Sequence, residues 1–73
     1  MHNDRPPRTI EVLLEPEGKT IIMPRPKTSM RLLQNLNLPT DAALVIRDGG
    51  LLTPDREVLP EDRITVRIVT SQG

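Results

Sequence analysis

Residues 8–23, RTIEVLLEPEGKTIIM, decide the fold that this sequence predicts. In the first half of the stretch, apolar side chains recur at every second position from Ile10 to Leu14, which is the period of a strand with one buried face. Residues 15–18 follow, with proline in second place and glycine in fourth, the composition of a tight turn. Residues 19–23 then supply a second run of β-forming side chains. Together these features predict a β-hairpin.

A short helix is expected after the hairpin. Pro24 and Pro26 end the second strand, since neither can donate a ladder hydrogen bond. Thr28 or Ser29 can cap the helix, and Pro39 is expected to stop it, because the residue before a proline is disfavoured in the helical region. The apolar stripe that would face a sheet consists of Leu32, Leu33 and Leu36, with Met30 at its edge.

The remaining chain predicts two or three further strands. Residues 44–46 begin one of them, and its facing is left open because all three side chains are apolar. Residues 48–50 form a turn, and the two leucines at 51–52 form either a short edge strand or a plug in the core. Residues 63–69 alternate cleanly and form the last strand. Its inward side chains are Ile64, Val66 and Ile68, and its outward ones are Arg63, Thr65 and Arg67.

The order β-β-α-β-(β)-β predicts an α+β roll in which one helix packs across a mixed sheet. This is the order of the β-grasp, or ubiquitin-like, fold. In that fold the last strand lies centrally, next to the first, and the chain leaves it straight into solvent. The expected organisation is a flexible N-terminal arm over residues 1–7, a β-grasp domain over residues 8–69 and a flexible C-terminal tail over residues 70–73.

Length and composition narrow the class of protein. A chain of 73 residues has room for one domain. It contains no cysteine and no aromatic residue, so its core depends on aliphatic packing, and the lone His2 offers no metal site. Ten acidic and ten basic residues cancel, and without aromatic side chains for base stacking no direct binding of nucleic acid is expected. No apolar run approaches the roughly 20 residues of a membrane span and no signal peptide is visible, so a cytoplasmic protein, monomeric when free, is expected.

Two stretches resemble the ThiS/MoaD family of ubiquitin-like sulfur carriers. Residues 44–55, LVIRDGGLLTPD, look like the middle of these carriers, and residues 59–66, LPEDRITV, resemble their approach to the final strand. The similarity extends over residues 8–73. Within the family, the LLTPD of residues 51–55 looks closest to the members that supply sulfur for tRNA thiolation, some of which also modify proteins.

The resemblance implies chemistry at Gly73. A ubiquitin-activating-type adenylyltransferase would use ATP to adenylate the Gly73 carboxylate, and a sulfur donor of the rhodanese or cysteine desulfurase type would convert the acyl-adenylate into a thiocarboxylate. A sulfur-accepting enzyme of tRNA thiolation or cofactor biosynthesis would then receive the sulfur. Thr70, Ser71 and Gln72 would thread into the partner, and glycine suits the terminus because it has no Cβ. The chain would bind no cofactor itself, and no arrangement of nucleophile, base and orienting group points to an enzyme.

One position departs from the family pattern. These carriers end in Gly-Gly, whereas this sequence ends in Gln72-Gly73. Three interpretations stay open: the natural chain continues with a further glycine, this member tolerates Gln72, or the chain is a relative that has lost carrier activity.

Four side chains are candidates for a partner-binding surface. Leu13 and Val69 are out of phase with their buried neighbours, so they would form an apolar patch for the activating enzyme, or else lie on a second covered face or stand as scattered exposed residues. Arg63 and Arg67 point outward, where they would steer docking to acidic residues or form an ordinary solvated face with cross-strand pairing to Glu11. The alternative class of function is a ubiquitin-like module that binds a protein through its sheet, without chemistry at the C-terminus.

Overall fold

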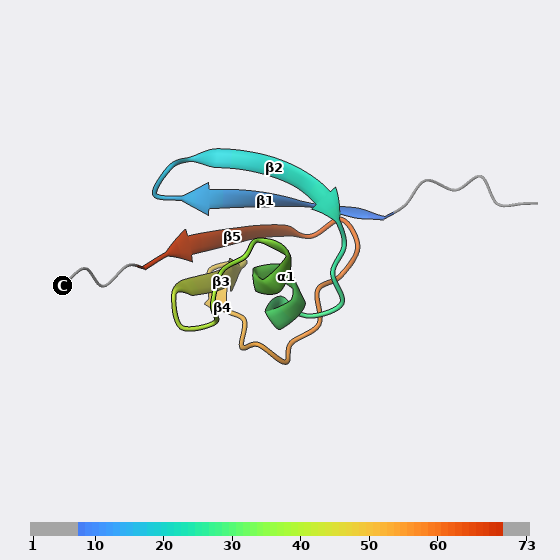
Figure 1. Cartoon of the computed structure of the whole chain (residues 1–73). Helices are drawn as coiled ribbons and strands as arrows, with labels where there is room; N and C mark the ends of the chain where they lie inside the picture. The colour runs from blue at the N-terminus through green and yellow to red at the C-terminus, as the bar shows by residue number, and fades with distance from the viewer. Residues whose placement is uncertain (1–7, 70–73) are drawn as a thin grey trace, which may run out of the picture.

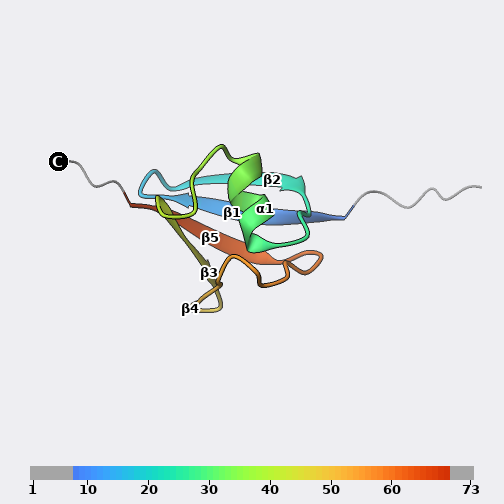
Figure 2. The ribbon, with the colours of Figure 1, turned by 60° about the horizontal axis from the view of Figure 1, so that its bottom comes forward.

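A computed structural model describes residues 8–69, which form a mixed β-sheet with a helix against one face (Figure 1). The strands are β1 (Thr9–Glu15), β2 (Lys19–Pro24), β3 (Ala43–Arg47), β4 (Gly50–Leu51) and β5 (Arg63–Ile68), and the helix is α1 (Ser29–Asn35). The order across the sheet is β2-β1-β5-β3-β4. Figure 2 shows α1 lying across the sheet. The predicted arm over residues 1–7 and tail over residues 70–73 lie outside the described residues.

The predicted hairpin is confirmed as β1 and β2. The two strands pair antiparallel from Thr9 opposite Pro24 to Leu14 opposite Lys19. The turn between them is closed by the Gly18 N–H, which donates to the Leu14 carbonyl at 2.7 Å. Gly18 has a φ of 76°, a left-handed conformation that glycine adopts without the steric cost of a Cβ. The glycine in the turn therefore permits the reversal that pairs the two strands.

Strand β5 joins the hairpin to the rest of the sheet. It pairs parallel with β1, from Glu11 opposite Arg63 to Glu15 opposite Arg67, and antiparallel with β3 on its other side. Parallel neighbours cannot be joined by a tight turn, so the chain must cross over between them, and α1 lies in this crossover. The last strand is therefore central, next to the first.

An aliphatic core fills the space between the sheet and α1. The predicted alternation of β1 and β5 is confirmed for their buried positions, while Leu14 packs at the margin of the core and Ile68 is half-buried. Val58 is a core residue that the sequence did not predict. It lies in a connection in which the sequence indicated only turns, and it is 0% exposed. The buried apolar residues are Ile10, Val12, Leu32, Leu33, Ala43, Val45, Val58, Ile64 and Val66.

The facing of β3, which the sequence left open, is fixed by two of its side chains. Ala43 and Val45 point into the core and are 7% and 3% exposed, whereas Leu44 points to the opposite face and is 40% exposed. The strand therefore presents its even-numbered side chains away from α1.

The two leucines after β3 have different roles. Asp48 and Gly49 have φ angles of 55° and 78°, the pattern of a two-residue hairpin turn between β3 and β4. Leu51 belongs to the edge strand β4, and Leu52 packs against the core. The sequence predicted either an edge strand or a plug in the core; Leu51 forms the first and Leu52 the second.

The start of α1 confirms Thr28 as its cap. The Thr28 hydroxyl accepts a hydrogen bond from the Arg31 N–H at 3.2 Å, and so satisfies one of the backbone donors that a helix N-terminus leaves free. Leu32 and Leu33 are buried as predicted, and Met30 is exposed at the edge of the stripe.

The end of α1 differs from the prediction. The helix stops at Asn35, ahead of Pro39. Asn37 adopts a φ of 60°, and the Leu38 N–H reaches back to the Leu33 carbonyl at 2.9 Å. This is a Schellman motif with asparagine in the left-handed position. The helix therefore ends at its own backbone motif, and Pro39 follows in the loop.

One ion pair fixes the connection between β4 and β5. Arg47 Nη1 lies 2.7 Å from Asp62 Oδ2, and the two side chains are only 18% and 16% exposed. The same Asp62 oxygen accepts from the Leu59 N–H at 2.9 Å, while Arg47 Nη1 donates to the Glu57 carbonyl at 3.3 Å. These bonds tie the connection to the end of β3 and position the start of β5.

We expect Val66→Asp to abolish folding. Val66 is fully buried in the central strand, and an unpaired buried carboxylate costs at least several kcal/mol, which is comparable with the whole stability of a domain this small. Thr65→Asp, one residue away on the opposite face, is the matched control and should fold. Far-UV circular dichroism with urea titration measures both, and a cooperative wild-type-like transition for Val66→Asp would contradict this strand assignment.

A double-mutant cycle tests the ion pair. Because the pair is largely buried and shares its carboxylate with a backbone donor, Arg47→Met and Asp62→Asn should each lower the free energy of unfolding by about 1–3 kcal/mol. The double variant should lose less than the sum of the two. Urea denaturation gives the three values, and strict additivity would show that the two side chains are not coupled.

Candidate functional site

The last described residues, at the end of β5, come directly before the predicted site of chemistry in the sequence. β5 leads to Val69, whose N–H donates to the Ala42 carbonyl at 2.8 Å and so extends the pairing with the start of β3 by one bond. The tail residues Thr70, Ser71, Gln72 and Gly73, to which the sequence assigned threading and adenylation, lie outside the described residues. Their roles stay predictions from the sequence.

The sheet face opposite α1, here the outer face, carries a row of side chains that crosses all five strands. Strand pairing places Thr20 beside Leu13, Leu13 beside Thr65, Thr65 beside Ile46, and Ile46 beside Leu51. We call these five residues the outer row. Leu51 is 65% exposed, and Leu13, Thr65 and Ile46 are half-buried. Since the row is continuous and partly apolar, it is suited to contact with a protein.

Two ion pairs flank the outer row. On one side, Arg63 Nε lies 3.8 Å from Glu11 Oε1, and on the other Arg67 Nη2 lies 3.0 Å from Glu15 Oε1. The cross-strand pairing of Arg63 with Glu11, one of the two sequence-based interpretations, is therefore present. Exposed pairs of this kind contribute only about 0–1 kcal/mol each. Both arginines stay accessible, because their side chains are 84% and 56% exposed.

The outer face also brings the other predicted residues together. Val69 is 47% exposed and lies two positions after Arg67, on the same face by strand alternation. Leu44, 40% exposed, lies opposite Arg67 on β3. Of the four predicted surface residues, Leu13, Arg63 and Arg67 lie on this face by strand register and Val69 by alternation.

Sequence reasoning missed four apolar residues of this face, namely Leu44, Ile46, Leu51 and Ile22, the last of which pairs with Glu11 and is 65% exposed. Leu44 and Ile46 could not be assigned to this face because the sequence did not show which side chains of β3 point inward. Choosing Val45 as its inward residue, paired with Val66 of β5, would have placed both on the outer face.

A shallow hollow of about 240 Å³ lies beside the outer row. It is lined by Glu11, Leu13, Thr20, Arg63, Ile64 and Thr65. Its lining thus comprises two apolar residues, two threonines and one ion pair. Over residues 8–69, no group of three or more histidine, cysteine, aspartate or glutamate residues is placed to hold a metal ion.

Comparisons with known proteins give no family. No protein-family model matches the chain, and no curated protein is significantly similar to it. Within the described residues, no helix has the length and apolar character required to cross a membrane.

Adjacent residues on β3 test the assignment of the outer face. We expect Leu44→Ala to change the free energy of unfolding by less than about 1 kcal/mol, because the side chain is exposed. Val45→Ala, the matched control on the core face, should cost about 1–3 kcal/mol through loss of packing. Thermal and urea denaturation compare the two, and a larger loss for Leu44→Ala would reverse the facing of β3.

Proposed function

We propose that this chain is a β-grasp sulfur carrier whose working group is the carboxylate of Gly73. The observation that supports this proposal best is the position of β5, which lies centrally and parallel to β1 while α1 covers one face. A central strand bonded on both sides gives a following tail a rigid base. This is the geometry that a carrier needs in order to present its terminus to another enzyme's active site.

The proposed chemistry begins with activation of a poor electrophile. An oxygen of the Gly73 carboxylate attacks the α-phosphorus of ATP in the partner adenylyltransferase, and pyrophosphate leaves. The terminal sulfur of the donor's persulfide then attacks the carbonyl carbon of the acyl-adenylate, and AMP leaves with the C–O bond electrons. A thiol reduces the resulting acyl disulfide and is itself oxidised to a disulfide. The product is a thiocarboxylate whose sulfur is a strong nucleophile. The chain supplies the reacting terminus, and the partners supply ATP, sulfur and catalysis.

The outer face is the proposed docking site for the activating enzyme. Its apolar members, Leu13, Ile46 and Leu51, would be covered by the partner. Arg63 and Arg67 would guide acidic groups of the partner to either side of the row. Val69 connects this face to the tail in the sequence, because it directly follows β5 and is the last described residue.

A ubiquitin-like binding module without C-terminal chemistry is the second candidate. The continuity of the outer row across all five strands favours it, since a protein could be held there with no role for the tail. The two functions differ in one requirement: a carrier needs Gly73, and a sheet-binding module does not.

Intact-mass measurement tests the carrier directly. The protein, isolated from its native host through an N-terminal tag added to its own gene, should show a species in which one oxygen is replaced by sulfur at the C-terminus. The mass also distinguishes a chain that ends in Gln72-Gly73 from one that continues with a further glycine. Fragmentation must place the sulfur in residues 70–73.

The control for this measurement is a change within the same tail. Deletion of Gly73 should abolish the sulfur-containing species, whereas Ser71→Ala should retain it, and both variants should melt like the wild type. An unmodified acid in every sample would refute the carrier. The binding module would be favoured if, in addition, the wild-type chain captures a protein partner and the Leu13→Asp variant does not.

A further inference from the structure

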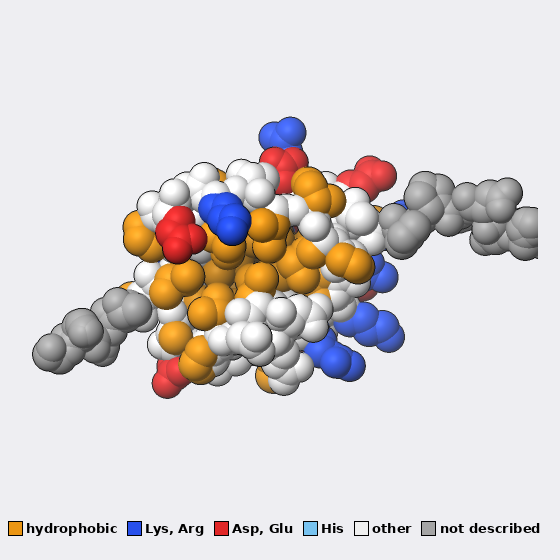
Figure 3. All heavy atoms as spheres, turned by 45° about the horizontal axis from the view of Figure 1, so that its top comes forward, with side chains coloured by type: hydrophobic (Ala, Val, Ile, Leu, Met, Phe, Trp, Pro, Cys, Tyr) orange, Lys and Arg blue, Asp and Glu red, His pale blue; other side chains and the backbone are white. Residues whose placement is uncertain are grey.

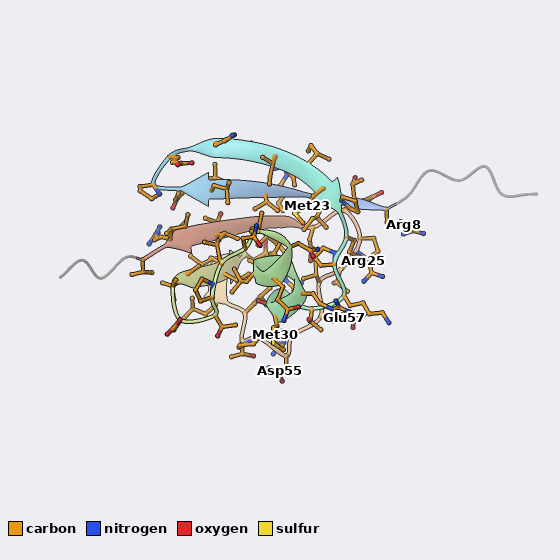
Figure 4. All side chains as sticks on the ribbon, viewed as in Figure 1. Arg8, Met23, Arg25, Met30, Asp55 and Glu57 are labelled. Carbon is orange, nitrogen blue, oxygen red and sulfur yellow. The ribbon has the colours of Figure 1, made fainter. Side chains whose placement is uncertain are left out.

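Five basic side chains lie at one end of the molecule. Backbone bonds bring their segments together: the Arg25 N–H donates to the Arg8 carbonyl, and the Ser29 N–H donates to the Arg56 carbonyl, each at 3.0 Å. Figure 3 shows blue side chains gathered at its right-hand end, and Figure 4 places Arg8 and Arg25 at that end of the sheet. We call this group the basic end; it consists of Arg8, Arg25, Lys27, Arg31 and Arg56.

The cations of the basic end differ from the other arginines of the described residues in their pairing with carboxylates. Arg47, Arg63 and Arg67 each have an acidic partner within 4 Å. None of the basic end's five side chains forms such a pair with a carboxylate of residues 8–69. Arg25 instead donates to the backbone carbonyl of Val58 at 2.8 Å. The chain has no net charge, so positive charge is concentrated at this end by its placement in the fold.

Two acidic residues lie in the neighbouring loop. Asp55 accepts a hydrogen bond from the Thr53 hydroxyl at 2.7 Å, and that bond lowers the pKa of its carboxyl. Glu57 pairs through its backbone with Thr28 in a β-bridge. Glu61 is a third acidic residue at this end, because its N–H donates to the Thr9 carbonyl next to Arg8. Three negative charges thus offset part of the five positive ones, and the basic end keeps a net positive charge.

A groove lies within the basic end. Its volume is about 320 Å³, and it is lined by Pro26, Lys27, Arg31 and Asn35. Arg31 and Asn35 are four residues apart on α1 and so share one face of the helix. Pro26 is buried, while the other three lining residues are exposed. The groove therefore presents an ammonium, a guanidinium and a side-chain amide, all of which can donate hydrogen bonds to carboxylate oxygens.

The basic end is remote from the C-terminal end of β5. Glu61, just before β5, donates its N–H to the Thr9 carbonyl, so β5 starts beside Arg8 and runs away from it. A strand of six residues spans about 20 Å. A partner at the basic end and another at the end of β5 could therefore be bound at the same time.

We propose that the basic end binds an acidic segment of a protein partner, with carboxylates seated between Lys27 and Arg31. The size of the groove suits side chains of a peptide, and the chain has no aromatic residue on which bases could stack. The basic end is separate from the outer row, and binding there does not depend on chemistry at Gly73. This proposal can therefore be tested independently of the proposed function.

Titration of the full, ¹⁵N-labelled chain with a capped oligoglutamate peptide tests the proposal. The amide signals of Lys27, Arg31 and Asn35 should shift, while those of Leu13 and Thr65 on the outer face should not. Binding should weaken steeply with added salt. Lys27→Glu should lower the affinity by about tenfold or more, whereas Lys19→Glu, the same charge reversal at the other end of β2, should change it by less than about twofold.

Two results would overturn the proposal. Equal losses for Lys27→Glu and Lys19→Glu, with both variants folded by circular dichroism, would show attraction to overall charge without a site. Tighter binding of transfer RNA than of oligoglutamate, with shifts at the same three residues, would assign the basic end to phosphate groups of nucleic acid.

Discussion

The parallel pairing of β1 with β5 is the interaction on which the rest of this structure depends. It is the contact that joins the N-terminal hairpin to β3 and β4, because β5 is bonded to β1 on one side and to β3 on the other. Without it the sheet would divide into the β1–β2 hairpin and a separate three-stranded unit of β5, β3 and β4, and an isolated hairpin is marginally stable in water. The same strand contributes Ile64 and Val66 to the core, so hydrogen bonding and apolar burial are lost together if the pairing fails.

The packing of the entirely aliphatic core depends in part on polar groups that position Val58. No aromatic side chain fills the space between sheet and helix, so the fit depends on branched side chains of moderate size. Val58 completes this packing from outside the regular elements. Its backbone is held by the Lys27 carbonyl and the Arg25 guanidinium. Arg47 and Asp62 bond the residues on either side of it. A buried ion pair of this kind is weak support for stability by itself, but here it positions an apolar residue.

Periodicity and turn composition predicted the hairpin, a cap at Thr28 or Ser29 and the facing of β5, since these depend on local sequence. Other features depend on tertiary context. Three consecutive apolar residues could not show that Val45 faces inward, because only pairing with β5 decides it. α1 ends where Asn37 adopts a left-handed conformation. Asparagine tolerates this conformation, but its presence in a sequence does not predict it. On the surface, alternation indicated Leu13 and the outward arginines. The groove beside Lys27 joins α1 to the segment after β2, and such a juxtaposition has no local signal.

The long separation of β1 and β5 along the chain also has a consequence for biosynthesis. On the ribosome, the hairpin and α1 emerge first, but the centre of the sheet cannot close until the residues of β5 have left the exit tunnel. Until then, the inward faces of Ile10 and Val12 lack the strand that buries them. Because folding waits for a contact between distant segments, it is slow relative to helical proteins of this size. Once β1 has emerged, one of its edges therefore stays unpaired until β5 follows, and such an edge is open to pairing with another chain.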